Sequence, residues 1–148
     1  LSSVMRRAAE LDGVGPIVQI GQRSVGSART SDRDDALAAG CVLISGREAQ
    51  HDGIARALAA IPEGARILIA LDVDALDPSV VPAVILPAPG GLTYMQVLDL
   101  VHGAAARGRI VGFDCVELMA SKDVDGLSCL TAGRIVANVI GLIARQGA

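Results

Sequence analysis

The sequence has 148 residues, which is the usual size of one protein domain. Lys and Arg total 13 against 16 Asp and Glu, so the formal net charge is −3 at pH 7. This weak negative charge, with Tyr94 and Phe113 as the only aromatic residues, argues against nucleic acid as a partner. The 51% share of hydrophobic residues is typical of a folded chain rather than a disordered one.

The longest stretch without a charged residue is Pro78–Leu98, but prolines and a Gly-Gly pair interrupt it. A spanning helix needs about 20 apolar residues without such breaks, so we expect no membrane insertion. Cys41, Cys115 and Cys129 are odd in number and lack metal-binding spacing, which is typical of free thiols and predicts a cytoplasmic protein. The first residues include neither an initiator Met nor an apolar signal region, so we expect part of a longer chain.

Apolar periodicity and capping residues predict alternating strands and helices. Short apolar runs indicate strands at Pro16–Ile20, Cys41–Ile44, Arg66–Leu71 and Arg109–Phe113. Amphipathic stretches indicate helices at Val4–Leu11, Ser31–Ala39, Gly46–Ala60, Tyr94–Arg107 and Leu127–Ile143. Capping boxes at Ser45–Glu48 and Thr93–Gln96 open two of these helices. Ser31 is the expected N-cap of the helix that ends at Ala39, and Gly40 fits the left-handed backbone position after its C-terminus.

Four strands separated by helices predict an α/β fold with a parallel sheet and helices on both faces. The unbroken apolar run Ile67–Ile69 indicates a central strand buried on both sides. In such sheets ligands bind beyond the carboxyl ends of the strands. The residues that follow the third and fourth strands are therefore the first candidates for a site.

Two aspartates follow the third strand. Asp72 and Asp74 are two apart on an extended backbone, so their carboxylates point to the same side with Cα atoms ~6.5 Å apart. Two converging carboxylates repel each other unless a cation lies between them, and a hard divalent ion such as Mn²⁺ or Mg²⁺ suits oxygen ligands. The alternative is that they cap the next helix or lie solvated in a turn, and Asp77 fits a turn better because Pro78 follows it.

Two further acidic residues follow the fourth strand. Asp114 is expected level with the ends of the neighbouring strands, and Glu117 in the loop that overhangs the site. A lone Glu at a strand end is commonly a surface residue, but a parallel arrangement places Glu117 beside the two aspartates. His51 and His102 lie in expected helices, where surface or packing roles are more common than ligation.

These segments carry a family resemblance. The stretch DVDALDPSVVPAVILPAPGGLTY (Asp72–Tyr94), followed by GFDCVEL (Gly112–Leu118), resembles the ureohydrolase superfamily of arginases and agmatinases, nearest to the agmatinase-like branch. IVQIGQRS (Ile17–Ser24) and VMRRA (Val4–Ala8) match similar upstream segments. The resemblance spans residues 1–148 as the C-terminal part of a single ureohydrolase domain. It implies a three-layer αβα sandwich with a mainly parallel sheet that is N-terminally incomplete.

The resemblance also implies a chemistry. Asp72 and Asp74 match metal ligands of a binuclear Mn²⁺ centre, where a bridging hydroxide attacks a guanidinium carbon and releases urea and an amine. Glu117 matches the acidic catalytic residue that binds the substrate's guanidinium group, while Asp77 and Asp114 are expected to support the site from behind the ligands. The implied substrate is an agmatine-like guanidino compound of polyamine metabolism, and the implied assembly is a trimer or hexamer.

The departures from the family pattern matter as well. The family's earlier metal-ligand motifs have no counterpart here, so we expect this chain alone to be inactive and the longer parent to be the enzyme. Ala83 stands where many members have Gly. One alternative is a haloacid-dehalogenase-like phosphotransferase, although Leu76 departs from its motif and Lys122, Asp123 and Asp125 imitate its other residues only loosely. Another alternative is a pseudoenzyme that keeps the fold without its metals.

Overall fold

The computed structural model describes residues 4–26 and 28–147, in which helices and strands alternate along the chain. The elements are α1 (Val4–Ala9), β1 (Val18–Gln22), α2 (Thr30–Ala38), β2 (Val42–Ser45), α3 (Gly46–Ala49), α4 (Gly53–Ala59), β3 (Arg66–Asp72), the 3₁₀ turn η1 (Val73–Ala75), α5 (Tyr94–Arg107), β4 (Arg109–Val116), the 3₁₀ turn η2 (Ala120–Lys122) and α6 (Leu127–Gln146). All four expected strands are present, and their pairings are parallel, as predicted.

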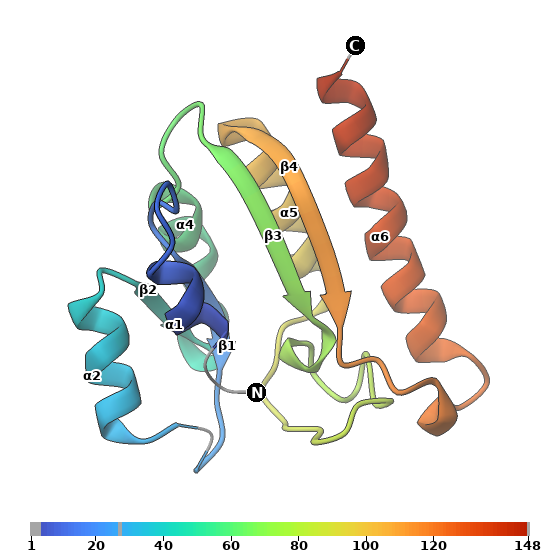
Figure 1. The fold of residues 1–148 in the computed structure, drawn as a ribbon. Helices are drawn as coiled ribbons and strands as arrows, with labels where there is room; N and C mark the ends of the chain where they lie inside the picture. Colours follow the sequence, from blue (N-terminus) through green and yellow to red (C-terminus); the bar gives the residue numbers. More distant parts are fainter. Residues whose placement is uncertain (1–3, 27, 148) are drawn as a thin grey trace.

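The strands form two separate pairs rather than one sheet (Figure 1). β1 pairs with β2, with Ile20 opposite Ile44, and β3 pairs with β4, with Leu71 opposite Cys115. The expectation of one four-stranded sheet is therefore wrong for the described residues. β1 contacts the η1 turn that follows β3, so the two pairs meet near the carboxyl end of β3.

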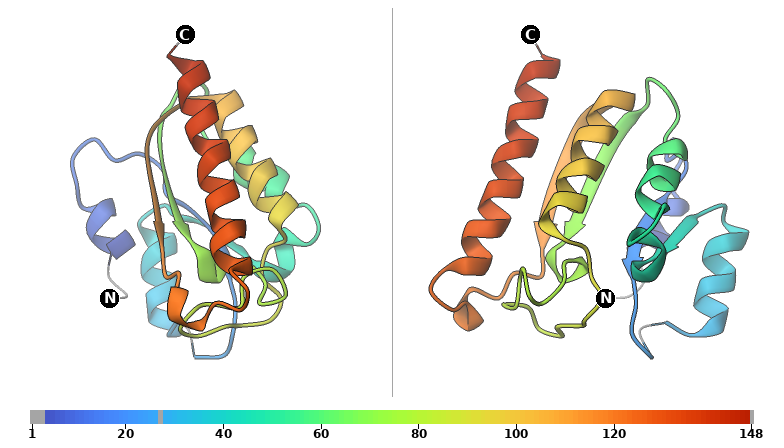
Figure 2. Two further views of the ribbon diagram at one scale, coloured as in Figure 1. Left: turned by 90° about the vertical axis from the view of Figure 1, so that its right-hand side faces the viewer. Right: turned by 180° about the vertical axis from the view of Figure 1, so that it is seen from behind.

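Helices α5 and α6 cover one face of β3 and β4. α5 lies behind these strands in Figure 1 and in front of them in the rear view of Figure 2. Buried apolar side chains from the strands and both helices form the core there, among them Leu71, Val97, Val101, Ile135 and Val139. This packing follows from the apolar stripe that each amphipathic helix turns towards the strands.

The opposite face of β3 and β4 is open. Leu68 is 67% exposed, and Val111 and Val116 are 47% and 49% exposed. The prediction that the third strand is buried on both sides is wrong for the described chain, because only the alternate residues Ile67, Ile69 and Leu71 are half-buried or buried. An apolar run predicts the capacity for two-sided burial, whereas burial itself needs a second covering layer.

Two helix starts follow the predicted caps and one does not. Glu48 N donates to Ser45 Oγ (3.2 Å) and Gln96 N donates to Thr93 Oγ1 (3.2 Å), so both capping boxes are confirmed. The expected cap at Ser31 is wrong, because the N-cap is Arg29, two residues earlier, and α2 begins at Thr30. There the Asp32 carboxylate accepts the Arg29 backbone N–H at 3.0 Å.

The helix expected from Gly46 to Ala60 is divided into α3 and α4. The break brings Gly53 against the backbone of Glu48, and a Cβ added at Gly53 would lie 2.7 Å from that carbonyl. A glycine permits this close approach where any side chain would clash. β4 also runs three residues further than predicted, to Val116, because the backbone pairing with β3 extends to Asp72.

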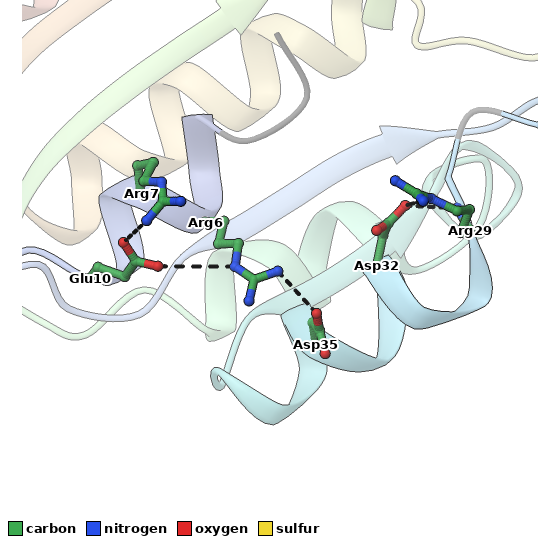
Figure 3. A network of polar contacts seen from close by, with 6 residues as sticks. All are labelled: Arg6, Arg7, Glu10, Arg29, Asp32 and Asp35. Carbon is green, nitrogen blue, oxygen red and sulfur yellow. Dashed lines mark hydrogen bonds and ion pairs between the residues drawn. The ribbon is translucent and has the colours of Figure 1, made fainter.

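Ion pairs connect α1 and α2 on the surface (Figure 3). Arg6 Nη1 lies 3.1 Å from Asp35 Oδ2 and so joins the two helices. Arg7 Nη1 lies 2.6 Å from Glu10 Oε2, just after the end of α1. The side chains of Arg6 and Asp35 are 65% and 59% exposed. Exposed pairs of this kind contribute little to stability, on the order of 0–1 kcal/mol each.

The C-terminal helix α6 has 20 residues and is the one helix in the described parts of the chain that is long and apolar enough to cross a membrane. A single such helix is a weak indication, since core helices of soluble proteins pass the same test. One side of α6, with Ala132, Ile135 and Val139, is buried in the core. The expectation of no membrane insertion stays a prediction.

Candidate active site

The two aspartates predicted as ligands lie together at the carboxyl end of β3. Asp72 is the last residue of the strand and Asp74 lies in the η1 turn. The Asp74 backbone N–H donates to Asp72 Oδ1 at 3.1 Å, so Asp72 also caps the 3₁₀ turn. The capping role and a ligand role are compatible, because a carboxylate has a second oxygen and further lone pairs.

The electrostatic setting of Asp72 is unfavourable for a bare carboxylate. The pKa of Asp72 is raised to about 6: burial is the largest cause and the charges of Asp74 and Glu117 add to it, while the hydrogen bond from the Asp74 N–H opposes them. Like charges that converge in a partly buried place disfavour ionisation. A bound divalent cation would reverse this effect, because it favours the ionised form of each carboxylate.

The charge of Glu117 raises the pKa of Asp72, so the two carboxylates lie near each other. Glu117 follows directly after β4, and its backbone φ of 67° places it in the left-handed region. This conformation is uncommon for a residue other than glycine and occurs often at functional sites.

Asp114 is placed differently from the prediction. It lies within β4 opposite Ala70, two positions ahead of the pair formed by Asp72 and Val116. Its carboxylate charge adds to burial in raising the pKa of the Cys115 thiol. Among the described residues, no hydrogen bond joins Asp114 to Asp72 or Asp74, so its predicted supporting role stays a prediction.

Asp77 closes the proline-rich loop that runs from residue 78 to 91. Its carboxylate accepts hydrogen bonds from Ser79 N (3.0 Å), Ser79 Oγ (2.6 Å), Gly90 N (2.8 Å) and Gly91 N (3.2 Å). The hydrogen bonds from Ser79 and then those from the two glycines lower its pKa to about 2. Asp77 therefore starts a turn, as predicted, and also ties the two ends of the loop together.

Arg23 is a residue that the motif analysis did not single out. Its half-buried guanidinium donates to backbone carbonyls that include Asp74 O at 2.7 Å, directly behind the acidic pair. It lies just after β1, in the segment Ile17–Ser24 that resembles the ureohydrolase superfamily. A charged residue directly after a strand at the ligand-binding edge was the available signal.

The residues present offer a partial metal site. Asp72 and Asp74 provide hard oxygen ligands of the type that Mn²⁺ prefers. In residues 4–26 and 28–147, no group of three or more His, Cys, Asp and Glu side chains could hold a metal ion. His51 lies exposed in the turn between α3 and α4 rather than inside one helix as predicted, whereas His102 lies within α5 as predicted, with its Nε2 3.2 Å from Asn138 Oδ1.

Comparison with known proteins identifies the fold and family. The model of the arginase family matches residues 1–141. The chain belongs to the arginase family. The agmatine ureohydrolase of Thermoplasma volcanium has a similar structure, with a TM-score of 0.78 and 30% identity over 95% of this chain and 46% of that one. The predicted resemblance and the α/β arginase-like fold class are thus confirmed.

Curated relatives of this arginase-family chain have different names. The N(1)-aminopropylagmatine ureohydrolase of Thermus thermophilus is 38% identical over 135 residues, which cover 86% of this chain and 42% of that protein. The guanidinopropionase of Pseudomonas aeruginosa is 34% identical over 153 aligned positions, which cover 97% of this chain and 46% of that protein. The chain therefore spans less than half the length of these relatives.

Proposed function

We propose that the full-length protein containing this arginase-family chain is a manganese-dependent hydrolase of an agmatine-like guanidino compound. The observation that carries the proposal is the convergence of Asp72, Asp74 and Glu117 at the carboxyl ends of β3 and β4. The names of the relatives support hydrolysis of guanidino compounds in general. The agmatine-like substrate and the requirement for Mn²⁺ are parts of the proposal.

In the proposed reaction, water adds to the guanidinium carbon and the bond from that carbon to the substituted nitrogen breaks. The protonated guanidino compound and one water give urea and a protonated amine, so atoms and charge balance. Glu117 has the charge and the two oxygens that suit the planar, doubly donating face of a guanidinium group. Its charge acts on Asp72, which lies at the end of β3.

Asp72 and Asp74 would hold the metal. When bound, Mn²⁺ supplies a water that is acidic enough to act as a nucleophile near neutral pH. The paired carboxylates of this chain contribute negative charge that favours the cation, and further ligands must complete its coordination. We therefore propose that the 148-residue chain alone binds Mn²⁺ weakly and releases no urea.

Two of the three residues that imitate the phosphotransferase pattern, Lys122 and Asp123, bond backbone groups elsewhere in the structure. Lys122 Nζ donates to the carbonyl oxygens of Val84 and Ile85, both at 3.3 Å. Asp123 accepts the backbone N–H groups of Ser128 (2.9 Å) and Cys129 (2.8 Å) at the start of α6. These two side chains thus serve the loop and the helix end, away from the role that the alternative needs.

The test is an assay of the full-length protein with added Mn²⁺ against agmatine, arginine and guanidinobutyrate, with urea as the readout. We expect urea release with a preference for agmatine. Asp72→Asn and Asp74→Asn should lower the Mn content and most of the activity, because an amide ligand leaves the cation less neutralised. Glu117→Gln should keep its metal and lose kcat/KM, because it keeps the shape but loses the charge that pairs with the guanidinium.

Asp99→Asn on the exposed side of α5 is the matched control and should behave as wild type. Full Mn content and activity in both aspartate variants would refute the site assignment. Mn²⁺ loss in Glu117→Gln equal to that in Asp72→Asn would refute the separate role of Glu117. A full-length protein that binds no Mn²⁺ and releases no urea would instead support the pseudoenzyme alternative.

A further inference from the structure

Arg23 connects three chain segments at the end where the two strand pairs meet. Its guanidinium donates to Gly21 O (3.1 Å) in β1, to Asp74 O (2.7 Å) and Leu76 O (3.1 Å) around η1, and to Ala88 O (2.9 Å from Nε and 2.7 Å from Nη2) in the proline-rich loop. All of these acceptors are backbone carbonyls. One side chain thus holds the backbone at and just after the candidate metal ligand Asp74.

Only an arginine can make this set of contacts. A guanidinium presents five N–H donors in a rigid plane, whereas lysine has a single nitrogen at the end of a flexible chain. Arg23 donates from Nε, Nη1 and Nη2 to carbonyls in three separate segments. Replacing it by lysine would keep the positive charge but release most of these segments.

The surrounding backbone is packed tightly against the Arg23 side chain. A Cβ at Gly46, the first residue of α3, would lie 2.6 Å from Gly90 O and 3.2 Å from Arg23 Cδ. A Cβ at Gly21 would lie 3.5 Å from the Cβ of Ala75 in η1. The absence of a side chain at Gly46 lets α3 and the loop close around the guanidinium, whereas Gly21 lies at an ordinary contact distance from η1.

We propose that Arg23 is a positioning residue that fixes the η1 backbone so that Asp72 and Asp74 hold the metal in the active geometry. The inference rests on the proposed function, since it assigns a role at the same site. At Asp74, Arg23 bonds the backbone carbonyl and not the carboxylate, so it acts through the residue that carries the ligand. Groups that orient metal ligands in this way affect metal affinity or activity by about 10–100-fold.

The experiment compares Arg23→Ala and Arg23→Lys with wild type in the full-length protein. Mn²⁺ is titrated while the paramagnetic resonance signal of the free ion is followed, and amide exchange is measured over residues 73–76. We expect at least about tenfold weaker Mn²⁺ binding in Arg23→Ala, faster exchange in η1, and partial recovery of kcat at high Mn²⁺ concentration. Arg23→Lys should show the same losses to a smaller degree, which covers the case in which Arg23→Ala does not fold.

Arg33→Ala is the matched control, because the Arg33 side chain is 64% exposed on α2 and pairs only with the neighbouring Asp34 among the described residues. It should leave Mn²⁺ affinity and η1 exchange unchanged. Wild-type Mn²⁺ affinity in both Arg23 variants would overturn the positioning role, while wild-type binding and urea release would leave the proposed function standing. A wild-type protein that neither binds Mn²⁺ nor releases urea would overturn the proposed function, and the positioning role with it.

Discussion

Asp77 offers a sharp local test, because a single carboxylate ties both ends of the proline-rich loop. In Asp77→Ala the N–H groups of Gly90 and Gly91 lose their acceptor, and so does the hydroxyl of Ser79. In Asp77→Asn one carbonyl oxygen remains, so part of this set survives without the negative charge. We expect the loop to open more often in both variants, and more in the alanine variant.

The pKa of Asp77 gives the size of the effect. The hydrogen bonds lower it from an ordinary value of 3.8 to about 2. In a buried carboxyl such a decrease would correspond to about 2 kcal/mol, but water reaches Asp77, so we reduce the contribution to about 1 kcal/mol. This corresponds to about fivefold faster exchange of the Gly90 and Gly91 amides in Asp77→Ala, if the loop opens locally.

The sign of the pH dependence follows from the lowered pKa. The bonds contribute fully above about pH 4, where the carboxyl is ionised even in the open loop, and the contribution is lost as the pH falls through about 2. Amide exchange in the full-length wild type should therefore become less protected between about pH 4 and about pH 2 at Gly90 and Gly91, after correction for intrinsic rates. Asp77→Asn should show no such change, since an amide does not titrate in this range.

Ser79→Ala is the matched control, because it removes the hydroxyl donor and leaves the two glycine amides bonded to Asp77. Its effect on exchange at Gly90 and Gly91 should be smaller than that of Asp77→Ala. Equal protection of these amides in wild type and Asp77→Ala would refute the loop-closing role of Asp77. A pH profile of Asp77→Asn that follows wild type would refute its electrostatic basis.

Three further predictions concern packing. Ser128→Ala should lower the free energy of unfolding by about 1–2 kcal/mol, because the fully buried Ser128 Oγ accepts the Ala83 N–H at 3.2 Å. An unchanged free energy of unfolding in denaturant titrations would contradict this. Gly53→Ala should lower the melting temperature, because its Cβ would lie 2.7 Å from the Glu48 carbonyl, and an equal or higher value would show that the α3–α4 turn adapts. The isolated 148-residue chain should self-associate through the exposed face of β3 and β4, as measured by sedimentation. Leu68→Lys should reduce this association. A wild-type chain that sediments as a monomer would refute self-association through this face.

The local features were accessible to sequence reasoning because they depend on neighbouring residues. Ser45 and Thr93 each bond a backbone N–H three positions ahead, so their spacing alone predicts the helix starts. The position of Asp72 and Asp74 at a strand end was predictable in the same way, because they directly follow the apolar run of β3. The fold class and the place of the candidate site at the strand ends therefore followed from the sequence.

Features that depend on distant partners were beyond such reasoning. The apolar run in β3 is the same whether one or both faces are covered, so the sequence could not predict that Leu68 is exposed. Ser31 was a reasonable cap by residue type, but the Asp32 carboxylate bonds the Arg29 N–H and starts the helix earlier. Arg23 was missed because its acceptors are carbonyls up to 65 positions away, and its place directly after a strand was the only sequence signal.

The separation of the two strand pairs explains why side-chain hydrogen bonds matter at this site. Hydrogen bonds along strands join β1 to β2 and β3 to β4, but none join the pairs to each other in the described parts of the chain. At the ligand-binding end, the contacts from Arg23 to η1 and from Gln50 Nε2 to Gly91 O (2.9 Å) cross from the first pair to the segment after β3. The geometry around Asp74 thus depends on side-chain bonds to loop backbone, and single substitutions there should affect the site more than equally buried changes within the strands.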